Sequence, residues 1–513
     1  MARKKADYYV FFVGGSGARV CKAFLHACAA GAFRSEEIKV LLLDADSENP
    51  ACQDCLRLYK KYESNRAMFH SESAETAQRT PLFQSTVKMY HEDGPVSPLR
   101  EEVAHLSDIT EHNRQRERAM KWFFTKKERD QDLRKGFYAH PNIGCIFFQN
   151  FGENQELRHC LRDIQESLTA EREVRIAVVG SVFGGTGAAG IPTIMKVIQD
   201  HCGGPKANLH FCGVLITPYF SVPPKREENG NIPIDSDSFK SNTRSALRYY
   251  QFTDQFERIY LVGKTSLDFV NPRYADGGVG QNNKPHIVEL FAAMAVRDFL
   301  ESGSRDRRTE GDRKIQTMII RPEDAQRIGW NSPFFDQNFR TMADMVRAQA
   351  ILEVAVKRYV DAKRTEKMMG RFQWYKAFFM EAGKNGENLD AIQDYGRDFL
   401  EWMYFLQYRF TQEESNAMQR DPGISLCGSM IEELLNELHG HGEIANSGRG
   451  GELNWKELQE KFDGLVTVAQ NVEYVVKKVF LLMSALGVAK PIVGKLGSIG
   501  LFMRLFELAG EKE

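Results

Sequence analysis

The chain has 513 residues, a length that allows two or three domains with large hydrophobic cores. Its 68 lysine and arginine residues balance 69 acidic residues, so the net charge of −1 excludes a global electrostatic signal for nucleic acid. No signal-peptide pattern opens the chain, and the longest apolar stretch, 479–489, is too short to span a bilayer. We therefore expect a soluble, cytoplasmic protein without a clear nucleic-acid or membrane signal.

A glycine loop follows the first predicted strand. The apolar run 8–13 predicts a strand, and residues 19–24 have helical character. Between them stand Gly14, Gly15, Ser16 and Gly17. A strand, a glycine loop and a helix in this order present backbone N–H groups and a positive helix end to phosphate. The loop is therefore a candidate phosphate-binding site.

Two carboxylates follow the next predicted strand. The apolar run 38–43 predicts that strand, and it leads into Asp44 and Asp46. Near a bound polyphosphate, Asp46 is a candidate Mg²⁺ ligand. The alternative is that one of the two aspartates caps a helix, a common role for Asp between a strand and a helix.

The segment 61–135 is a strongly charged stretch that predicts a helical insertion. It contains one cluster of large apolar residues, namely Met120, Trp122, Phe123 and Phe124. We expect this cluster to be the packed side of a helix.

A second glycine loop follows the strand predicted at 174–180 and precedes a helical segment at 193–200. It consists of Gly184, Gly185, Thr186 and Gly187. The glycines allow close approach of an anion, and the threonine adds a hydroxyl donor. Helices and strands alternate from 143 to 262, which predicts a mostly parallel, Rossmann-like α/β sheet with helices on both faces.

In kind and in order, these motifs resemble those of the tubulin/FtsZ superfamily. Residues 183–189 resemble the family's phosphate loop, and Pro192 matches the proline that follows it in FtsZ. Four further segments resemble its first glycine loop, its acidic turn, its third loop and a later strand end: 14–17, 43–45, 139–144 and 214–220. Three residues depart from the phosphate loop of the family: Phe183, Ala188 and Ala189.

The resemblance implies a tubulin-like nucleotide domain over 1–335 that binds GTP or GDP with Mg²⁺. It assigns nucleotide contacts to both glycine loops, to Asp44, and to His140 and Pro141 in the third loop. It also gives three candidates for contacts to the base and ribose: Asn242, Arg244 and Asn283. Ala18 stands where the family has a guanine-contacting asparagine, and Lys264 stands near the position of a second one, so ATP or another nucleotide stays open.

Hydrolysis in this family depends on an acidic loop that follows the central helix and completes the site of a neighbouring subunit. Residues 285–300 resemble that helix, but no recognisable acidic motif follows. Asp306 and Asp312 are the candidate catalytic carboxylates, and a solvated charged turn is the alternative. The resemblance therefore implies a homo-oligomer, a filament or a nucleotide-controlled switch, with slow or assembly-dependent triphosphate hydrolysis.

The last part of the chain, 336–513, has long helical periods and predicts a mainly helical C-terminal domain. Apolar residues at Met342, Met345 and Val346 fit one buried helix face, and those at 399–406 fit another. We expect this domain to pack on the nucleotide domain. The alternative is a surface for a protein partner.

Two other functions remain open. The first is a Rossmann-type NAD(P)-dependent oxidoreductase, in which Gly14–Gly17 binds pyrophosphate and Asp44 or Asp46 holds a ribose hydroxyl. That function leaves the loop Gly184–Gly187 unexplained, and Val20 occupies the last glycine position of the fingerprint. The second is a scaffold in which the nucleotide is only structural.

Overall fold

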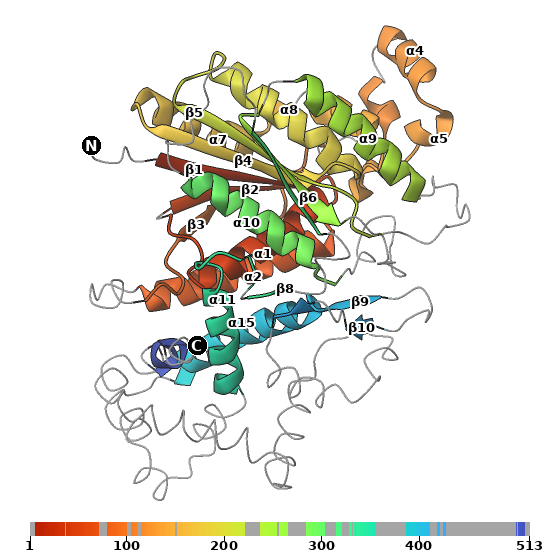
Figure 1. The fold of residues 1–513 in the computed structure, drawn as a ribbon. Coiled ribbons are helices and arrows are strands. Elements are labelled where there is room, and N and C mark those ends of the chain that lie inside the picture. The colour runs from red at the N-terminus through yellow and green to blue at the C-terminus, as the bar shows by residue number, and fades with distance from the viewer. Residues whose placement is uncertain are drawn as a thin grey trace, which may run out of the picture.

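The computed structural model contains a seven-stranded sheet with helices on both faces, followed by a part made mainly of helices (Figure 1). The expected fold class is therefore confirmed. The structure describes residues 6–35, 37–70, 80–99, 104–110, 114–148, 151–220, 236–253, 256–264, 284–302, 314–320, 328–330, 332–333, 335–353, 386–410, 418–420, 424–426, 499 and 501–507. Within these residues, no helix is both long enough and apolar enough to cross a lipid bilayer.

All neighbouring strands of the sheet are parallel, in the order β3-β2-β1-β4-β5-β6-β7. Their bounds are β1 Ala6–Val13, β2 Glu37–Leu43, β3 Thr86–Met89, β4 Glu173–Ser181, β5 Leu209–Ile216, β6 Arg258–Lys264 and β7 Lys314–Ile320. From β1 the sheet continues through β2 to β3 on one side, and from β4 it continues through β5 and β6 to β7 on the other, so the strand order reverses between β1 and β4. In open α/β sheets, ligands bind outside the carboxyl ends of the strands at such a switch point.

Each face of the sheet has its own hydrophobic core. On β1, Val10 and Phe12 belong to one core and Tyr9 and Phe11 to the other, as the two-residue period of a strand requires. The first core is covered by α1 Gly14–Ala29, α2 Pro50–Phe69 and α10 Ile287–Glu301. The second is covered by α6 Pro141–Phe148, α7 Gln155–Thr169 and α8 Gly185–His201, with η3 Phe151–Glu153 beside them and α9 Ser236–Phe252 at the flank (Figure 1).

The segment 61–135, expected as a helical insertion, contains a strand of the main sheet. Helix α2 continues into it as far as Phe69, and β3 then pairs with β2. The rest of the segment holds η1 Leu106–Thr110, α4 Arg114–Phe123, α5 Lys126–Arg129 and η2 Leu133–Lys135.

The aromatic cluster on α4 does not pack inward as a unit. Phe124, just beyond the helix, is buried, whereas Trp122 is 86% exposed and Phe123 is 75% exposed. The expectation of a packed face is wrong for these two residues. Successive residues of a helix point about 100° apart, so three adjacent aromatic side chains cannot all face one core.

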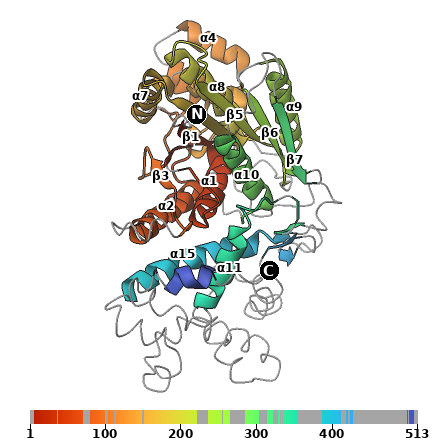
Figure 2. The ribbon, with the colours of Figure 1, turned by 60° about the vertical axis from the view of Figure 1, so that its left-hand side comes forward.

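The C-terminal part is built around α11 Thr341–Ile351 and α15 Gly386–Phe405, which lie together below the sheet in Figure 2. Its short strands are β9 Tyr408–Phe410, β10 Met418–Arg420 and β11 Ile424–Ser425, and β11 pairs with β8 Ile328–Gly329, which precedes this part in the chain. Met342, Met345 and Val346 are buried as expected. Helix α15 docks on α1, where the buried His26 ring lies 4.7 Å from the Trp402 ring, centroid to centroid.

Candidate functional site

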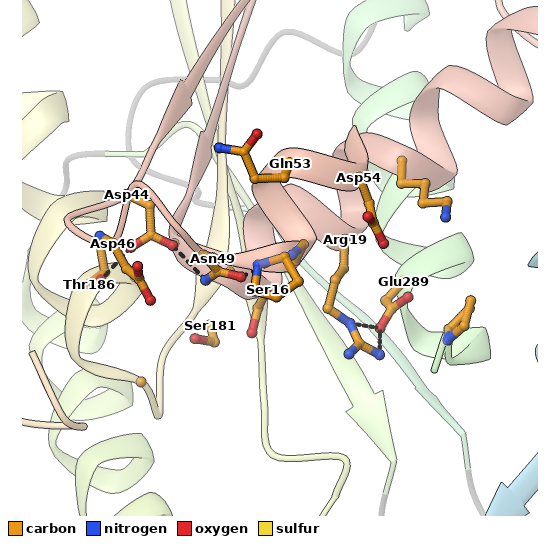
Figure 3. Close-up of a pocket in the computed structure, with 18 of the residues that line it drawn as sticks. Ser16, Arg19, Asp44, Asp46, Asn49, Gln53, Asp54, Ser181, Thr186 and Glu289 are labelled. Atoms are coloured by element: carbon orange, nitrogen blue, oxygen red, sulfur yellow. Dashed lines mark hydrogen bonds and ion pairs between the residues drawn. The ribbon is translucent and has the colours of Figure 1, made fainter. Parts of the chain in front are cut away.

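A cavity of about 840 Å³ opens at the carboxyl ends of the central strands, beside the switch point of the sheet (Figure 3). Its lining includes residues at or just after the ends of four strands: Gly14, Asp44, Ser181 and Tyr219. The place that parallel α/β topology favours for a ligand therefore coincides with both glycine loops.

Two helices begin at this cavity without side-chain caps. Helix α1 starts at Gly14 and α8 at Gly185, and neither has a capping side-chain hydrogen bond or an acidic residue in its first turn. The first N–H groups of a helix have no partner inside the helix, and the helix dipole makes this end positive. Two such ends at one cavity form a cradle for an anion.

The glycines of the two loops serve different purposes. Gly14 has a φ of +75°, a conformation that favours glycine. A Cβ on Gly185 would lie 2.7 Å from the Cβ of Phe137, and one on Gly187 would lie 2.5 Å from the Ser181 carbonyl oxygen. These two glycines permit close packing, whereas Gly184 faces the cavity, where a Cβ would meet only the Ser181 hydroxyl oxygen, at 2.9 Å.

Asp44 and Asp46 are both buried and both line the cavity. The Thr186 hydroxyl of the second glycine loop donates to Asp44 at 3.5 Å, and the Asn49 amide donates to the other carboxylate oxygen at 3.0 Å. Burial, together with the negative charge of Asp46, raises the pKa of Asp44 to about 7. The alternative role as a helix cap belongs to Asn49, whose side chain accepts from the Ala51 N–H at the start of α2.

This carboxylate pair fits a divalent cation. A Mg²⁺ ion beside it would offset both the desolvation and the mutual repulsion that raise the pKa of Asp44. In the described part of the chain, no group of three or more His, Cys, Asp or Glu residues is placed to hold a metal. Further ligands for such an ion would therefore come from phosphate oxygens and water.

The opposite end of the cavity is formed by a buried ion pair. Arg19 of α1 contacts Glu289 of α10 at 2.5 Å, and the exposed fractions of their side chains are 12% and 2%. The Tyr219 hydroxyl donates to the same carboxylate at 3.1 Å, and Arg19 also donates to the carbonyl oxygen of Lys284. Nearby aromatic residues lining this end are Phe183, Phe220 and Phe239.

Helix α15 supplies a further wall that the sequence did not indicate. Lys61 of α2 forms ion pairs with Asp394 at 3.0 Å and Asp398 at 2.8 Å, and all three residues line the cavity. Lys284 lies over the Phe405 ring, 4.1 Å from its centroid. A segment more than 300 residues after α2 thus borders the same cavity as the glycine loops.

Several residues expected in the site lie beside it. His140 and Pro141 do not line the cavity, whereas the residues just before them do, from 135 to 139. The Nδ1 atom of His140 instead lies 3.9 Å from a carboxylate oxygen of Glu128, and burial lowers the pKa of His140. Gly17 also lies behind the cavity, where a Cβ would stand 2.8 Å from the Phe12 carbonyl carbon.

Of the three base and ribose candidates, the two that the structure describes do not line the cavity. Asn242 donates to the carbonyl oxygens of Ala139 at 2.7 Å and Phe183 at 3.1 Å, so it holds two cavity segments together from behind. Arg244 is exposed on α9. Asn283 and the catalytic candidates Asp306 and Asp312 lie outside the described residues.

No protein-family model matches this chain, and no curated protein matches its sequence. Among solved structures, it is similar to CetZ from Methanosaeta thermophila, with 14% identity and a TM-score of 0.25. The match covers 59% of this chain and 56% of that protein, so this chain spans just over half of its length. With so low a TM-score, we draw no conclusion on function from this similarity.

Proposed function

We propose that this chain is a tubulin-like protein that binds a nucleoside triphosphate, GTP by family resemblance, together with Mg²⁺. Its nucleotide domain spans 1–335, and the helical part from 336 packs on it. The observation that carries this proposal is the meeting of two uncapped helix N-termini and a buried carboxylate pair at one cavity. Backbone donors and a metal together suit the charge of a triphosphate.

Each part of the cradle has a role in this proposal. Backbone N–H groups of Gly14–Ser16 and Gly184–Gly187 hold phosphate oxygens, and the Thr186 hydroxyl adds a donor. Asp46, with Asp44 beside it, holds Mg²⁺ directly or through water. The metal neutralises phosphate charge, and the base lies toward Tyr219 and Phe239.

The oxidoreductase is the second candidate, because the strand order of the sheet is also that of dinucleotide-binding folds. In such a fold the acidic residue after β2 contacts a ribose hydroxyl. Here Asp44 instead accepts from Thr186 and Asn49, so it is turned toward the second glycine loop. That contact favours a polyphosphate with a metal over a dinucleotide.

Assembly and turnover form part of the same proposal. A nucleotide at a head-to-tail contact between subunits would give filaments or closed oligomers, and hydrolysis would be slow without the neighbouring subunit. The measurement is triphosphate hydrolysis over a wide range of protein concentration, with light scattering in parallel. A specific rate that rises with concentration supports assembly-dependent turnover, whereas a fast and constant specific rate contradicts it. Binding without any turnover would favour the scaffold with a structural nucleotide.

The cradle itself is tested by Gly184→Val. The backbone of Gly184 is extended, with φ −82° and ψ 171°, so valine fits the chain while its side chain enters the cavity. We expect the variant to fold and to bind Mg²⁺–triphosphate at least about 100-fold more weakly, a loss of about 2.8 kcal/mol. Gly94→Val is the matched control, because Gly94 lies away from the cavity with its nearest neighbour 3.9 Å from a Cβ. If Gly184→Val folds and binds Mg²⁺–triphosphate normally, the phosphates do not bind at this cradle.

A further inference from the structure

A second surface of the protein has the features of a docking site. Trp122 and Phe123 at the end of α4 are adjacent aromatic side chains that are 86% and 75% exposed. Just behind them, Phe124 is buried and Met120 packs against the same core, so the helix is anchored while its aromatic tip faces outward. Figure 1 shows α4 and α5 at the edge of the molecule farthest from the C-terminal helices.

Basic residues surround this aromatic tip. The segment 114–129 has seven basic and two acidic residues, a charge of +5 in a chain whose total is −1. Four of its basic residues have side chains that the structure shows as exposed: Arg118, Lys121, Lys126 and Lys127. We call these four residues, with Trp122 and Phe123, the α4–α5 surface. Its charge is complementary to an anionic partner.

The arrangement of the two aromatic rings favours a lipid surface over nucleic acid. Trp122 and Phe123 are adjacent on a helix and point about 100° apart, so they cannot form one continuous platform for stacked bases. Both can enter the interface of a bilayer, where tryptophan and phenylalanine are favoured, while lysines beside them reach lipid phosphates. A symmetric contact between two copies would bring two strongly basic segments together, which is repulsive.

We propose that the α4–α5 surface binds anionic lipid bilayers, with Trp122 and Phe123 entering the interface and the four basic residues contacting lipid headgroups. Two aromatic side chains and a few basic charges give weak, reversible binding, which several copies in one assembly would strengthen. This binding does not depend on the nucleotide. The surface is connected to the cavity along the chain, because η2 and the cavity-lining residues 135–139 follow α5 directly.

The test is co-sedimentation of the full chain with vesicles of neutral phosphatidylcholine alone or with about 30% phosphatidylserine. We expect binding to the anionic vesicles only, weakening as salt is raised. Trp122→Ala/Phe123→Ala should reduce binding about 10-fold or more, and Lys126→Glu/Lys127→Glu about 10- to 100-fold. All four side chains are exposed, so both variants should fold. Phe252→Ala, at an aromatic residue 82% exposed on α9, and Lys206→Glu are the matched controls.

Insertion is tested separately with brominated lipids, which should quench tryptophan fluorescence in the native chain and much less in Trp122→Phe. Absence of binding to anionic vesicles would overturn the proposal, as would binding that both double variants leave unchanged. If the double variants instead abolish binding to single-stranded RNA or reduce self-association while vesicle binding is absent, the surface serves that other partner and the proposal is wrong. Binding to neutral vesicles of the same strength would also contradict the role of charge.

Discussion

At one end of the cavity a ligand would meet the backbone N–H groups of two short glycine loops, whereas at the other it would meet side chains from α1, α10 and α15. Short stretches of sequence determine the first end, because each glycine loop directly follows its strand and Asp44 directly follows β2. The second end depends on long-range contacts such as the pair between Arg19 and Glu289, 270 positions apart. Substitutions at the first end should therefore act mainly on ligand binding, and those at the second mainly on stability.

The buried pair should give the largest effect. Arg19→Met leaves the carboxylate of Glu289 buried without its cation, and we expect a loss of about 3–5 kcal/mol in the free energy of unfolding. Denaturant unfolding measures this loss. The double variant Arg19→Met/Glu289→Leu should recover much of it, because no charge then stays buried. Unchanged stability in Arg19→Met would mean that the pair is solvated. The second end of the cavity would then matter no more for stability than the first.

Asp46 tests the first end with a smaller effect. Asp46→Ala should weaken Mg²⁺-dependent triphosphate binding by about 10- to 100-fold, as expected for one charged contact of about 1.5–3 kcal/mol. Diphosphate binding should fall less, since the terminal phosphate shares the metal. Titration calorimetry measures both, with Asp54→Ala, a partly exposed carboxylate elsewhere on the cavity, as the control. Equal losses for both nucleotides would remove the metal role from Asp46.

His26, which packs between α1 and α15, should make the stability of the protein sensitive to pH. Burial, and then the charge of Lys22, holds the pKa of His26 well below its ordinary value. Below about pH 6.5 the unfolded chain binds a proton that the folded protein excludes, so the free energy of unfolding falls as pH decreases, by up to about 1.4 kcal/mol per pH unit. His26→Leu should show a shallower fall between about pH 6.5 and 5. His70 and His140, whose pKa values burial also lowers, remain in both proteins. If the free energy of unfolding falls with the same slope in both, His26 is not the source of the pH dependence.

Lys61 should give the smallest effect. Its side chain is 30% exposed, and its partners Asp394 and Asp398 are 60% and 36% exposed. Water and salt screen such pairs, so Lys61→Ala should lower the free energy of unfolding by less than about 1 kcal/mol. Thermal unfolding of the native chain and the variant at low and high salt measures this loss. The difference in stability between the two proteins should shrink at high salt. A loss as large as that of Arg19→Met would show that this outer wall is as tightly coupled as the buried pair.

The sequence predicted the parts of the site whose determinants are neighbours along the chain. Gly184–Gly187 and Asp44 follow predicted strands, and parallel topology brings strand ends to one edge. Arg19 lies two positions after the first glycine loop, and this closeness to the loop could have marked it as a cavity residue. The roles of Glu289 and Trp402 depend on how distant helices pack, which periodicity does not specify. Trp122 was misjudged because apolar residues on a helix are usually buried, and nothing local shows that this helix projects outward.

The most direct test of the central claim is to denature the purified protein and identify the released small molecules by chromatography and mass spectrometry. The proposed site predicts a nucleoside diphosphate or triphosphate in a fixed ratio to the chain, and tight binding of Mg²⁺–triphosphate to protein freed of it. Because Gly184→Val fills the cradle, the same measurement on that variant should release much less nucleotide. Release of NAD(P), or neither release nor binding of any nucleotide, would contradict the account.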